Sequence, residues 1–147
     1  MHKRVFRLIT LLFSDLRYKS IKSDSRARKE TKDCSVISMA IVLGISYAES
    51  HEAFAKCGRL YKVGTTANKV NGVLYHFGVK YKRYNKFEVQ EMSNSLLTFE
   101  TIPVILKPKG KYLLISKKHS AAVIDRKVVD WSAGSDREVV SLVEILL

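Results

Sequence analysis

Three residues whose side chains can together hydrolyse a carbonyl compound occur in the chain order cysteine, histidine, aspartate. Cys34 begins an apolar run, and far downstream His119 and Asp130 flank two short apolar segments. A thiol attacks a carbonyl carbon as its thiolate, which needs a base to take its proton and a third group to orient that base. We therefore expect Cys34 to be the nucleophile, His119 the general base and Asp130 the residue that orients His119.

The segment around Cys34 has the pattern of a buried helix with the thiol in its first turn. Asp33 is a suitable N-cap, Gly44 is a C-terminal stop, and most residues between them are apolar. This position favours the thiolate, because the free N–H groups and the positive dipole end of a helix stabilise an anion. Two further helices are expected, from the capping box of Ser46 and Glu49 to Gly58 and from Gly64 to Gly78.

The second half of the chain changes from helical to extended periodicity. It predicts a short helix at 87–97 and a hairpin turn at 125–127, which would place His119 opposite a residue just beyond Asp130. Side chains paired across antiparallel strands lie about 4.5–5.5 Å apart, within reach of a carboxylate and an imidazole. Helices followed by an antiparallel sheet make an α+β fold. The strands are expected at 79–84, 102–106, 111–116, 120–124, 128–130 and 139–146.

The net charge of +12 is unevenly distributed. Residues 1–32 hold ten Lys and Arg against three Asp and Glu, or +7, and the remaining residues hold 16 against 11, or +5. We expect Val5–Tyr18 to form an amphipathic helix and Ser20–Lys32 a linker, so that residues 1–32 are a basic arm ahead of a domain at 33–147. Such an arm is either a solubilising segment or a contact for nucleic acid, an acidic protein or an anionic membrane.

Length and composition argue against several classes of protein. A chain of 147 residues, 46% of them hydrophobic, suits one folded domain, and two cysteines are too few for a disulfide scaffold. No zinc-finger, P-loop or helix-turn-helix spacing occurs, so we expect no metal and no cofactor. Arg7 interrupts the N-terminal apolar stretch and no cleavage site follows, so no secretory signal is expected. No apolar run approaches the roughly 20 residues of a membrane span, and a reducing, cytoplasmic setting is expected.

Two separated blocks of sequence resemble one enzyme family. The first block comprises residues 33–40 (DCSVISMA), 44–52 (GISYAESHE), 58–59 and 64–65, and the second comprises 110–114 (GKYLL), 119–125 (HSAAVID) and 128–130 (VVD). Both blocks resemble small papain-like cysteine peptidases of phages and bacteria, which are relatives of the double-glycine peptidases that process bacteriocin leaders. The resemblance covers residues 31–147 and leaves the basic arm unexplained.

The resemblance implies a papain-like α+β fold, in which N-terminal helices pack on a C-terminal antiparallel sheet. It implies Cys34 as nucleophile on the central helix, His119 as base and then acid, and Asp130 as the residue that orients His119. The function implied is hydrolysis of a peptide or isopeptide bond in a peptide or protein substrate, by a phage-encoded enzyme in the cytoplasm of its host.

One feature of the family is missing from this chain. Papain-like enzymes usually place a Gln a few residues before the Cys to help bind the oxyanion, and residues 25–32 contain no Gln. The backbone N–H of Cys34, with Thr31 or Lys32, is the expected substitute. Loss of one oxyanion donor typically costs roughly 100- to 1000-fold in rate.

Other notable residues have structural as well as functional interpretations. Cys57 is expected to be structural, and His51 and His76 are expected to be ordinary surface or boundary histidines. Trp131 would either cover the catalytic pair or pack at the edge of the sheet. The basic and aromatic residues of Lys80–Lys86 match a single-strand nucleic-acid surface or an edge strand protected by lysines.

A second function therefore stands beside hydrolysis. A catalytically weak or inactive papain-like scaffold would act as a basic binding protein for nucleic acid or for a host nucleic-acid machine, through residues 1–32 and Lys80–Lys86. Binding that is sensitive to salt and independent of Cys34 distinguishes this function from that of a hydrolase.

Overall fold

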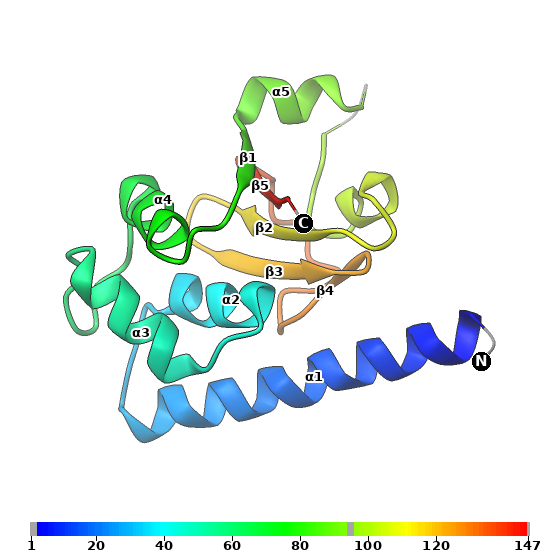
Figure 1. The fold of residues 1–147 in the computed structure, drawn as a ribbon. Coiled ribbons are helices and arrows are strands. Elements are labelled where there is room, and N and C mark those ends of the chain that lie inside the picture. The colour runs from blue at the N-terminus through cyan, green and yellow to red at the C-terminus, as the bar shows by residue number, and fades with distance from the viewer. Residues whose placement is uncertain (1–2, 94–95, 147) are drawn as a thin grey trace.

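The computed structural model describes residues 3–93 and 96–146, with side chains from Phe13 onward. The helices are α1 (Lys3–Ala27), α2 (Cys34–Leu43), α3 (Tyr47–Lys56), α4 (Ala67–His76), α5 (Lys86–Glu91) and the 3-10 helix η1 (Ile102–Ile105). The strands are β1 (Tyr81–Tyr84), β2 (Lys111–Ile115), β3 (Ser120–Ile124), β4 (Lys127–Val128) and β5 (Ser141–Ile145). The protein is α+β, as predicted, and its four longest helices precede the sheet in the chain (Figure 1).

The five strands form one antiparallel sheet in the order β1-β5-β2-β3-β4, and both faces of this sheet are covered. On β3, Ala122 and Ile124 belong to the apolar cluster shared with α2. Ala121 and Val123 belong to a second cluster, shared with α5 and η1. This double coverage explains why every residue of β3 is buried and why its sequence does not alternate between apolar and polar residues.

Helix α2 is the centre of the helical layer. Its residues 36–42 are all buried, because α1, α3 and β3 each pack against it (Figure 1). Gly44 ends the helix with a left-handed φ of 68°, and its N–H bonds to a carbonyl of the last turn. The hydroxyl groups of Ser38 and Ser120 lie 3.2 Å apart in a hydrogen bond that joins α2 to β3.

The segment predicted to be a linker is mostly helical, because α1 continues to Ala27. Arg17 donates hydrogen bonds of 3.1 Å to the carbonyl oxygens of Ala40 and Ile45, which fastens α1 to the C-terminal end of α2 and the residues that follow it. Ile21 is buried in the core, so the C-terminal half of α1 is part of the domain. The N-terminal half projects beyond the other elements (Figure 1). Neither α1 nor any other helix in the described part of the chain is long and apolar enough to cross a bilayer.

Three other predicted elements differ from the structure. The strand expected at 102–106 is the 3-10 helix η1. Pro103 lies in its first turn, where the backbone N–H that proline lacks would have no hydrogen-bond partner within the helix. The helix expected at 87–97 is the shorter α5, and residues 94–95 lie outside the described ones. The strand expected at 128–130 is the shorter β4, which begins one residue earlier and ends at Val128.

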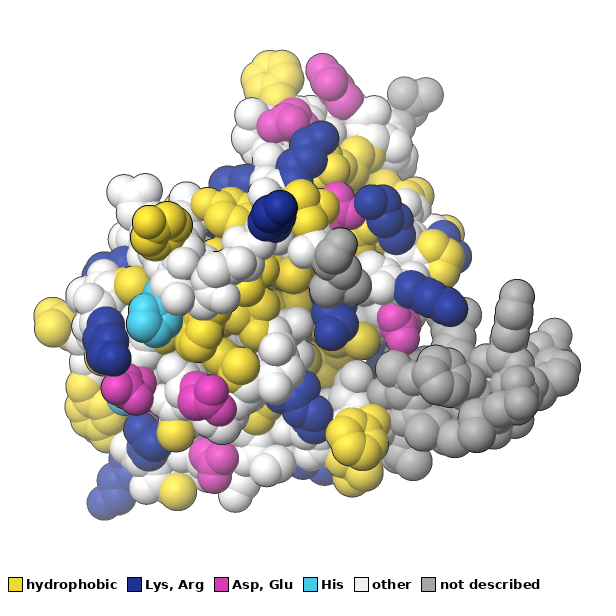
Figure 2. Space-filling model, viewed as in Figure 1, with side chains coloured by type: hydrophobic (Ala, Val, Ile, Leu, Met, Phe, Trp, Pro, Cys, Tyr) yellow, Lys and Arg dark blue, Asp and Glu magenta, His cyan; other side chains and the backbone are white. Residues whose placement is uncertain are grey.

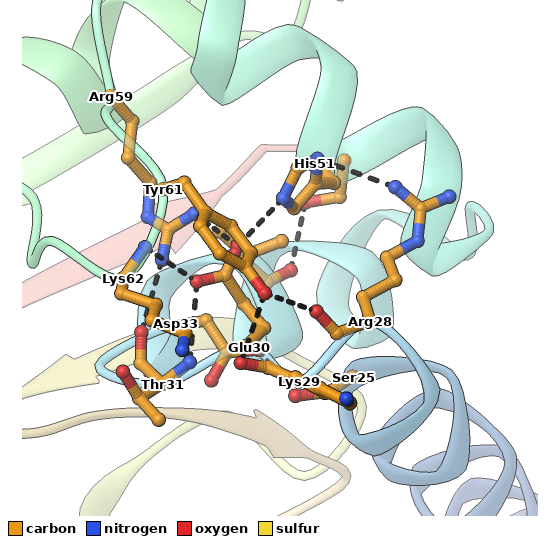
Figure 3. A network of polar contacts seen from close by, with 12 residues as sticks. Ser25, Arg28, Lys29, Glu30, Thr31, Asp33, His51, Arg59, Tyr61 and Lys62 are labelled. Carbon is orange, nitrogen blue, oxygen red and sulfur yellow. Dashed lines mark hydrogen bonds and ion pairs between the residues drawn. The ribbon is translucent and has the colours of Figure 1, made fainter.

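A buried polar network fastens the loop between α1 and α2 (Figure 3). Its centre is the carboxylate of Glu30, whose side chain is fully enclosed. Arg59 Nη1 donates to this carboxylate at 3.1 Å, and His51 Nε2 lies 2.7 Å from it. The backbone N–H groups of Thr31 and Lys62 also donate to it. Burial disfavours the charged carboxylate, but these hydrogen bonds outweigh burial and lower the pKa of Glu30 to about 2.

Asp33 lies at the N-cap position of α2, but its side chain does not cap the helix as predicted. Its Oδ2 instead accepts hydrogen bonds from the Ser25 hydroxyl at 2.6 Å and from the Tyr47 hydroxyl at 2.9 Å. The carboxylate thus joins α1 and α3 behind the start of α2. The first N–H groups of α2 therefore have no side-chain cap from Asp33, and they lie beside Cys34.

We predict that Glu30→Gln lowers the free energy of unfolding by about 3–5 kcal/mol at pH 7, because Arg59 stays buried without its charged partner. Urea denaturation measures this change. The double variant Glu30→Gln/Arg59→Met should lose less free energy of unfolding than Glu30→Gln alone. An equal or larger loss would contradict the explanation by an unpaired buried charge.

The same variant has a predictable pH dependence. Because folding lowers the pKa of Glu30 from 4.5 to about 2, its stabilisation is fully present above pH 4.5 and is lost as the pH falls through 2. The difference in stability between the native protein and Glu30→Gln should therefore shrink in acid.

Candidate active site

The β3–β4 hairpin brings His119 and Asp130 together. Its two turn residues, Asp125 and Arg126, have the left-handed φ values, 50° and 66°, that a tight two-residue hairpin turn requires. The register continues past the end of β4, since the N–H of Val129 donates to a carbonyl of β3. His119 Nε2 then lies 2.8 Å from Asp130 Oδ2. The short turn predicted from the sequence is thus the feature that joins these two side chains.

Cys34 is the first residue of α2, and it lines the same cavities as His119, close enough for the two side chains to shift each other's pKa. Burial favours the neutral thiol. The hydrogen bond with His119 and those from the backbone of Ser120 and Ser35 outweigh burial, so the pKa of Cys34 is lowered. The backbone of β3 and the first turn of α2 therefore both stabilise the thiolate.

His119 is 9% exposed, and its imidazole interacts with two acidic groups, the carboxyl group of Asp130 and the thiol of Cys34. Burial alone would lower its pKa. Hydrogen bonds with Asp130 and Cys34 and the charges of both outweigh burial and raise the pKa of His119 to about 9. The raised pKa of His119 and the lowered pKa of Cys34 together favour a thiolate–imidazolium pair at neutral pH.

Ser132 holds Asp130 in place and was not singled out from the sequence. Its backbone N–H donates to Asp130 Oδ1 at 2.6 Å, and its fully buried hydroxyl donates to the same oxygen. Burial would raise the pKa of Asp130, but the hydrogen bonds from His119 and Ser132 lower it. An Asp followed two residues later by Ser is a common local turn pattern, and this signal could have identified Ser132.

Trp131 covers the histidine from one side. The centroids of the Trp131 and His119 rings lie 4.7 Å apart, and the Arg137 guanidinium lies 4.9 Å from the centroid of the Trp131 ring. Trp131 is still 61% exposed, so it forms part of the wall of the site. Tyr18 of α1 lines the same cavity as Trp131, which brings α1 to this wall.

Cys34 lies where two cavities meet. The first has a volume of about 200 Å³ and is bounded by α1 through Tyr18. The second has a volume of about 620 Å³ and is bounded by the loop at Gly64 and Thr65. Because Cys34 and His119 line both cavities, an extended chain that occupies both would pass directly over the thiol. We refer to the two cavities together as the cleft.

Lys32 lies in the loop just ahead of α2 and borders the cleft. It lines both cavities, whereas Thr31 lines neither. Arg28, further upstream, is turned toward α3, where its guanidinium lies 5.5 Å from the centroid of the Tyr47 ring. The backbone N–H of Cys34 is at the first position of α2 and has no acceptor within the helix. Lys32 and this N–H are therefore the candidate donors to an oxyanion beside the thiol.

The other candidate residues lie elsewhere. The sulfur of Cys57 packs against Gly72, where an added Cβ would lie only 3.2 Å away from it. The ring of His76 packs on the ring of Phe77. His51 belongs to the network around the buried carboxylate of the α1–α2 loop, a role that its sequence position does not reveal. Among the described residues, no group of three or more His, Cys, Asp or Glu side chains could hold a metal ion.

The stretch Lys80–Lys86 contains β1, which is an edge strand of the sheet. Tyr81 packs against one core cluster and Tyr84 against the other. The ammonium group of Lys82 lies 4.9 Å from the centroid of the Tyr84 ring. Both tyrosines are therefore engaged with the protein, an arrangement that fits an edge strand protected by lysines.

We predict that Cys34 reacts with iodoacetamide at pH 6 at least about tenfold faster than Cys57, because a lowered pKa supplies thiolate at that pH. The rate should fall in acid as the thiolate is protonated, and it should change again near pH 9 as His119 loses its proton. In His119→Ala, the pH at which the alkylation rate of Cys34 falls in acid should rise toward the ordinary pKa of a thiol. Alkylation followed by mass spectrometry measures both cysteines in one sample, and equal rates at pH 6 would contradict the assignment.

Comparison of the chain with protein-family models, with curated proteins and with solved structures found no match. The chemical interpretation of the site therefore depends on its own geometry. That geometry joins a half-buried thiol on α2, an imidazole immediately before β3 and a carboxylate in the segment after β4.

Proposed function

We propose that the protein is a papain-like cysteine hydrolase that cleaves a peptide or isopeptide bond through an acyl-enzyme on Cys34. One observation carries the proposal: His119 Nε2 lies 2.8 Å from Asp130 Oδ2, and the same imidazole lines both cavities beside the Cys34 thiol, an interaction that helps to raise the pKa of His119. Because Nε2 faces Asp130, Nδ1 is the ring nitrogen left for the Cys34 thiol. This arrangement orients the imidazole for proton transfer at the sulfur.

In the first half of the reaction the thiolate of Cys34 attacks the carbonyl carbon of the substrate. A carbon–sulfur bond forms, and the carbonyl oxygen becomes an oxyanion. His119, already protonated, gives its proton to the leaving amine as the carbon–nitrogen bond breaks. The products are a free amine and a thioester on Cys34.

In the second half His119, now neutral, takes a proton from water as the water oxygen attacks the thioester carbon. The carbon–sulfur bond breaks, the carboxylic acid leaves, and the thiolate–imidazolium pair is restored. Asp130 keeps Nε2 protonated and oriented through both steps, and Ser132 keeps Asp130 in place. Trp131 limits access of solvent to one side of the imidazole.

We predict that Cys34→Ala abolishes cleavage of a randomised peptide library and that His119→Ala lowers it about 10²- to 10⁴-fold, the usual contribution of a general acid–base group. Cys57→Ala is the matched control and should keep full activity. Mass spectrometry of the digested library provides the measurement. Cleavage that survives Cys34→Ala would refute the proposal.

The oxyanion formed in the first step needs donors in place of the missing Gln. Lys32 and the backbone N–H of Cys34 are the groups available for this role. We predict that Lys32→Met lowers kcat roughly 100- to 1000-fold with little change in KM, because the donor acts on charge that develops in the transition state. Lys32→Gln should retain more activity than Lys32→Met, and equal losses would argue against a hydrogen-bonding role.

The alternative function, a basic binding protein on the same scaffold, is favoured by one observation. The N-terminal half of α1 projects from the domain, and its sequence includes Lys3, Arg4 and Arg7 (Figure 1). Salt-sensitive binding through this half of the helix would survive Cys34→Ala, so the variant that tests hydrolysis also separates the two functions.

A further inference from the structure

We propose that the cleft accepts a peptide segment with Asp or Glu on both sides of the scissile bond, recognised by four lysines: Lys22, Lys32, Lys117 and Lys118. This inference rests on the proposed function, because it identifies the substrate class of the same site. We call these four residues the cleft lysines.

The cleft lysines come from three segments that are distant in sequence. Lys22 is on α1 and Lys32 is in the loop before α2, while Lys117 and Lys118 form the turn between β2 and β3. Lys22 lines the first cavity and Lys117 the second, whereas Lys32 and Lys118 line both. A substrate lying across Cys34 would therefore meet positive charge on both sides of the thiol.

Within the described part of the chain, no carboxylate forms an ion pair with a cleft lysine. Among the described residues, the lysines that form ion pairs with carboxylates lie elsewhere: Lys56, Lys86, Lys107 and Lys127. The two carboxylates in the walls of the cleft already have partners, since Asp33 accepts from two hydroxyl groups and Asp130 accepts from His119 and Ser132. Unpaired charges of one sign in a concave site with low-dielectric walls attract ligands of the opposite sign.

The positive lining continues beyond the cleft. A neighbouring hollow is lined by Lys117 and Lys118 together with Lys86, Arg137 and Glu138. Its single carboxylate, from Glu138, is already paired with Lys86 at 3.6 Å. An acidic chain longer than the cleft would therefore still meet positive charge along this side.

Two observations favour an acidic peptide over nucleic acid in the cleft. Proteins that bind single strands stack bases on available aromatic rings, but the ring of Trp131, although 61% exposed, already packs against the His119 ring and the Arg137 guanidinium. On the face seen in Figure 2, the coloured Lys and Arg side chains are scattered among acidic and apolar ones, so that face offers no broad basic patch along which nucleic acid could continue beyond the cleft. Positive charge without free stacking surfaces suits carboxylates better than bases.

The first test compares two alkylating reagents of similar size, anionic iodoacetate and neutral iodoacetamide, on Cys34 of the full-length protein. The ratio of their rates reports the local potential and does not require turnover. At low salt, Lys22→Glu/Lys117→Glu should lower this ratio roughly tenfold, and raising the salt concentration should shrink the effect. Lys22→Gln/Lys117→Gln should give an intermediate value. The matched control, Lys19→Glu/Lys109→Glu, makes the same charge change at exposed positions outside the cleft and should leave the ratio near the native value.

The second test asks which anion the cleft holds. A glutamate-rich decapeptide should protect Cys34 from iodoacetamide several-fold better than its glutamine counterpart, and the protection should be lost in Lys22→Glu/Lys117→Glu but kept in the control pair. Better protection by a ten-residue oligothymidylate than by the glutamate-rich peptide would overturn the inference in favour of nucleic acid. Equal protection by the glutamate and glutamine peptides would overturn it as well.

The two proposals fail in distinguishable ways. If the reagent ratio and the peptide protection change as expected but Cys34 supports no hydrolysis, the anion-binding cleft is supported and the hydrolase is refuted. If peptides are cleaved through Cys34 without enrichment of Asp or Glu near the cleavage sites, and the reagent ratio is unchanged in Lys22→Glu/Lys117→Glu, the hydrolase stands and the substrate class proposed here is wrong. Circular dichroism of each variant confirms that a lost effect does not come from unfolding.

Discussion

Burial of α2 on every side is the constraint on which the rest of the structure depends. Each square ångström of apolar surface removed from water contributes roughly 25 cal/mol, so a helix with buried residues throughout 36–42 must be enclosed by other elements. Helices α1 and α3 and strand β3 supply that enclosure. The start of α2 is thereby pressed against the start of β3, with the Ser38–Ser120 hydrogen bond across the contact. Packing of rigid elements, and not a loop, thus places Cys34 beside His119.

Two polar networks meet at the start of α2. Behind it, Glu30 and Asp33 tie the incoming loop to α1, α3 and the loop that follows α3 (Figure 3). In front of it, Asp130 holds His119 against the thiol. Buried charges are tolerated only when they are paired and hydrogen-bonded, so each network specifies one arrangement of its backbone. The peptide that carries Cys34 is therefore held from both sides, as a preorganised site requires.

Helix α1 has two halves with different relations to the domain. Its C-terminal half contributes Arg17 and Ile21 to the packing of α2, and Tyr18 and Lys22 to the wall of the cleft. Its N-terminal half projects from the domain (Figure 1). The basic residues within 1–32 therefore do not all belong to one arm that could be separated from the domain. Deleting all of these residues would uncover α2 and remove Glu30, so a role for the projecting half is better examined by substitution than by truncation.

The sequence by itself determined the local elements and the candidate triad. Capping residues, terminal glycines and apolar runs predicted α2, α3, α4 and most strands, because these signals act within a few residues. The β3–β4 turn was also local, so the approach of His119 and Asp130 could be expected from spacing alone. Only the tertiary structure decided the rest: the helical course of residues 20–27, the hydrogen bonds of Asp33, the pairing of His51 and Arg59 with Glu30, and the gathering of the cleft lysines. Each of these depends on contacts between segments far apart in the chain, which periodicity and capping patterns do not encode.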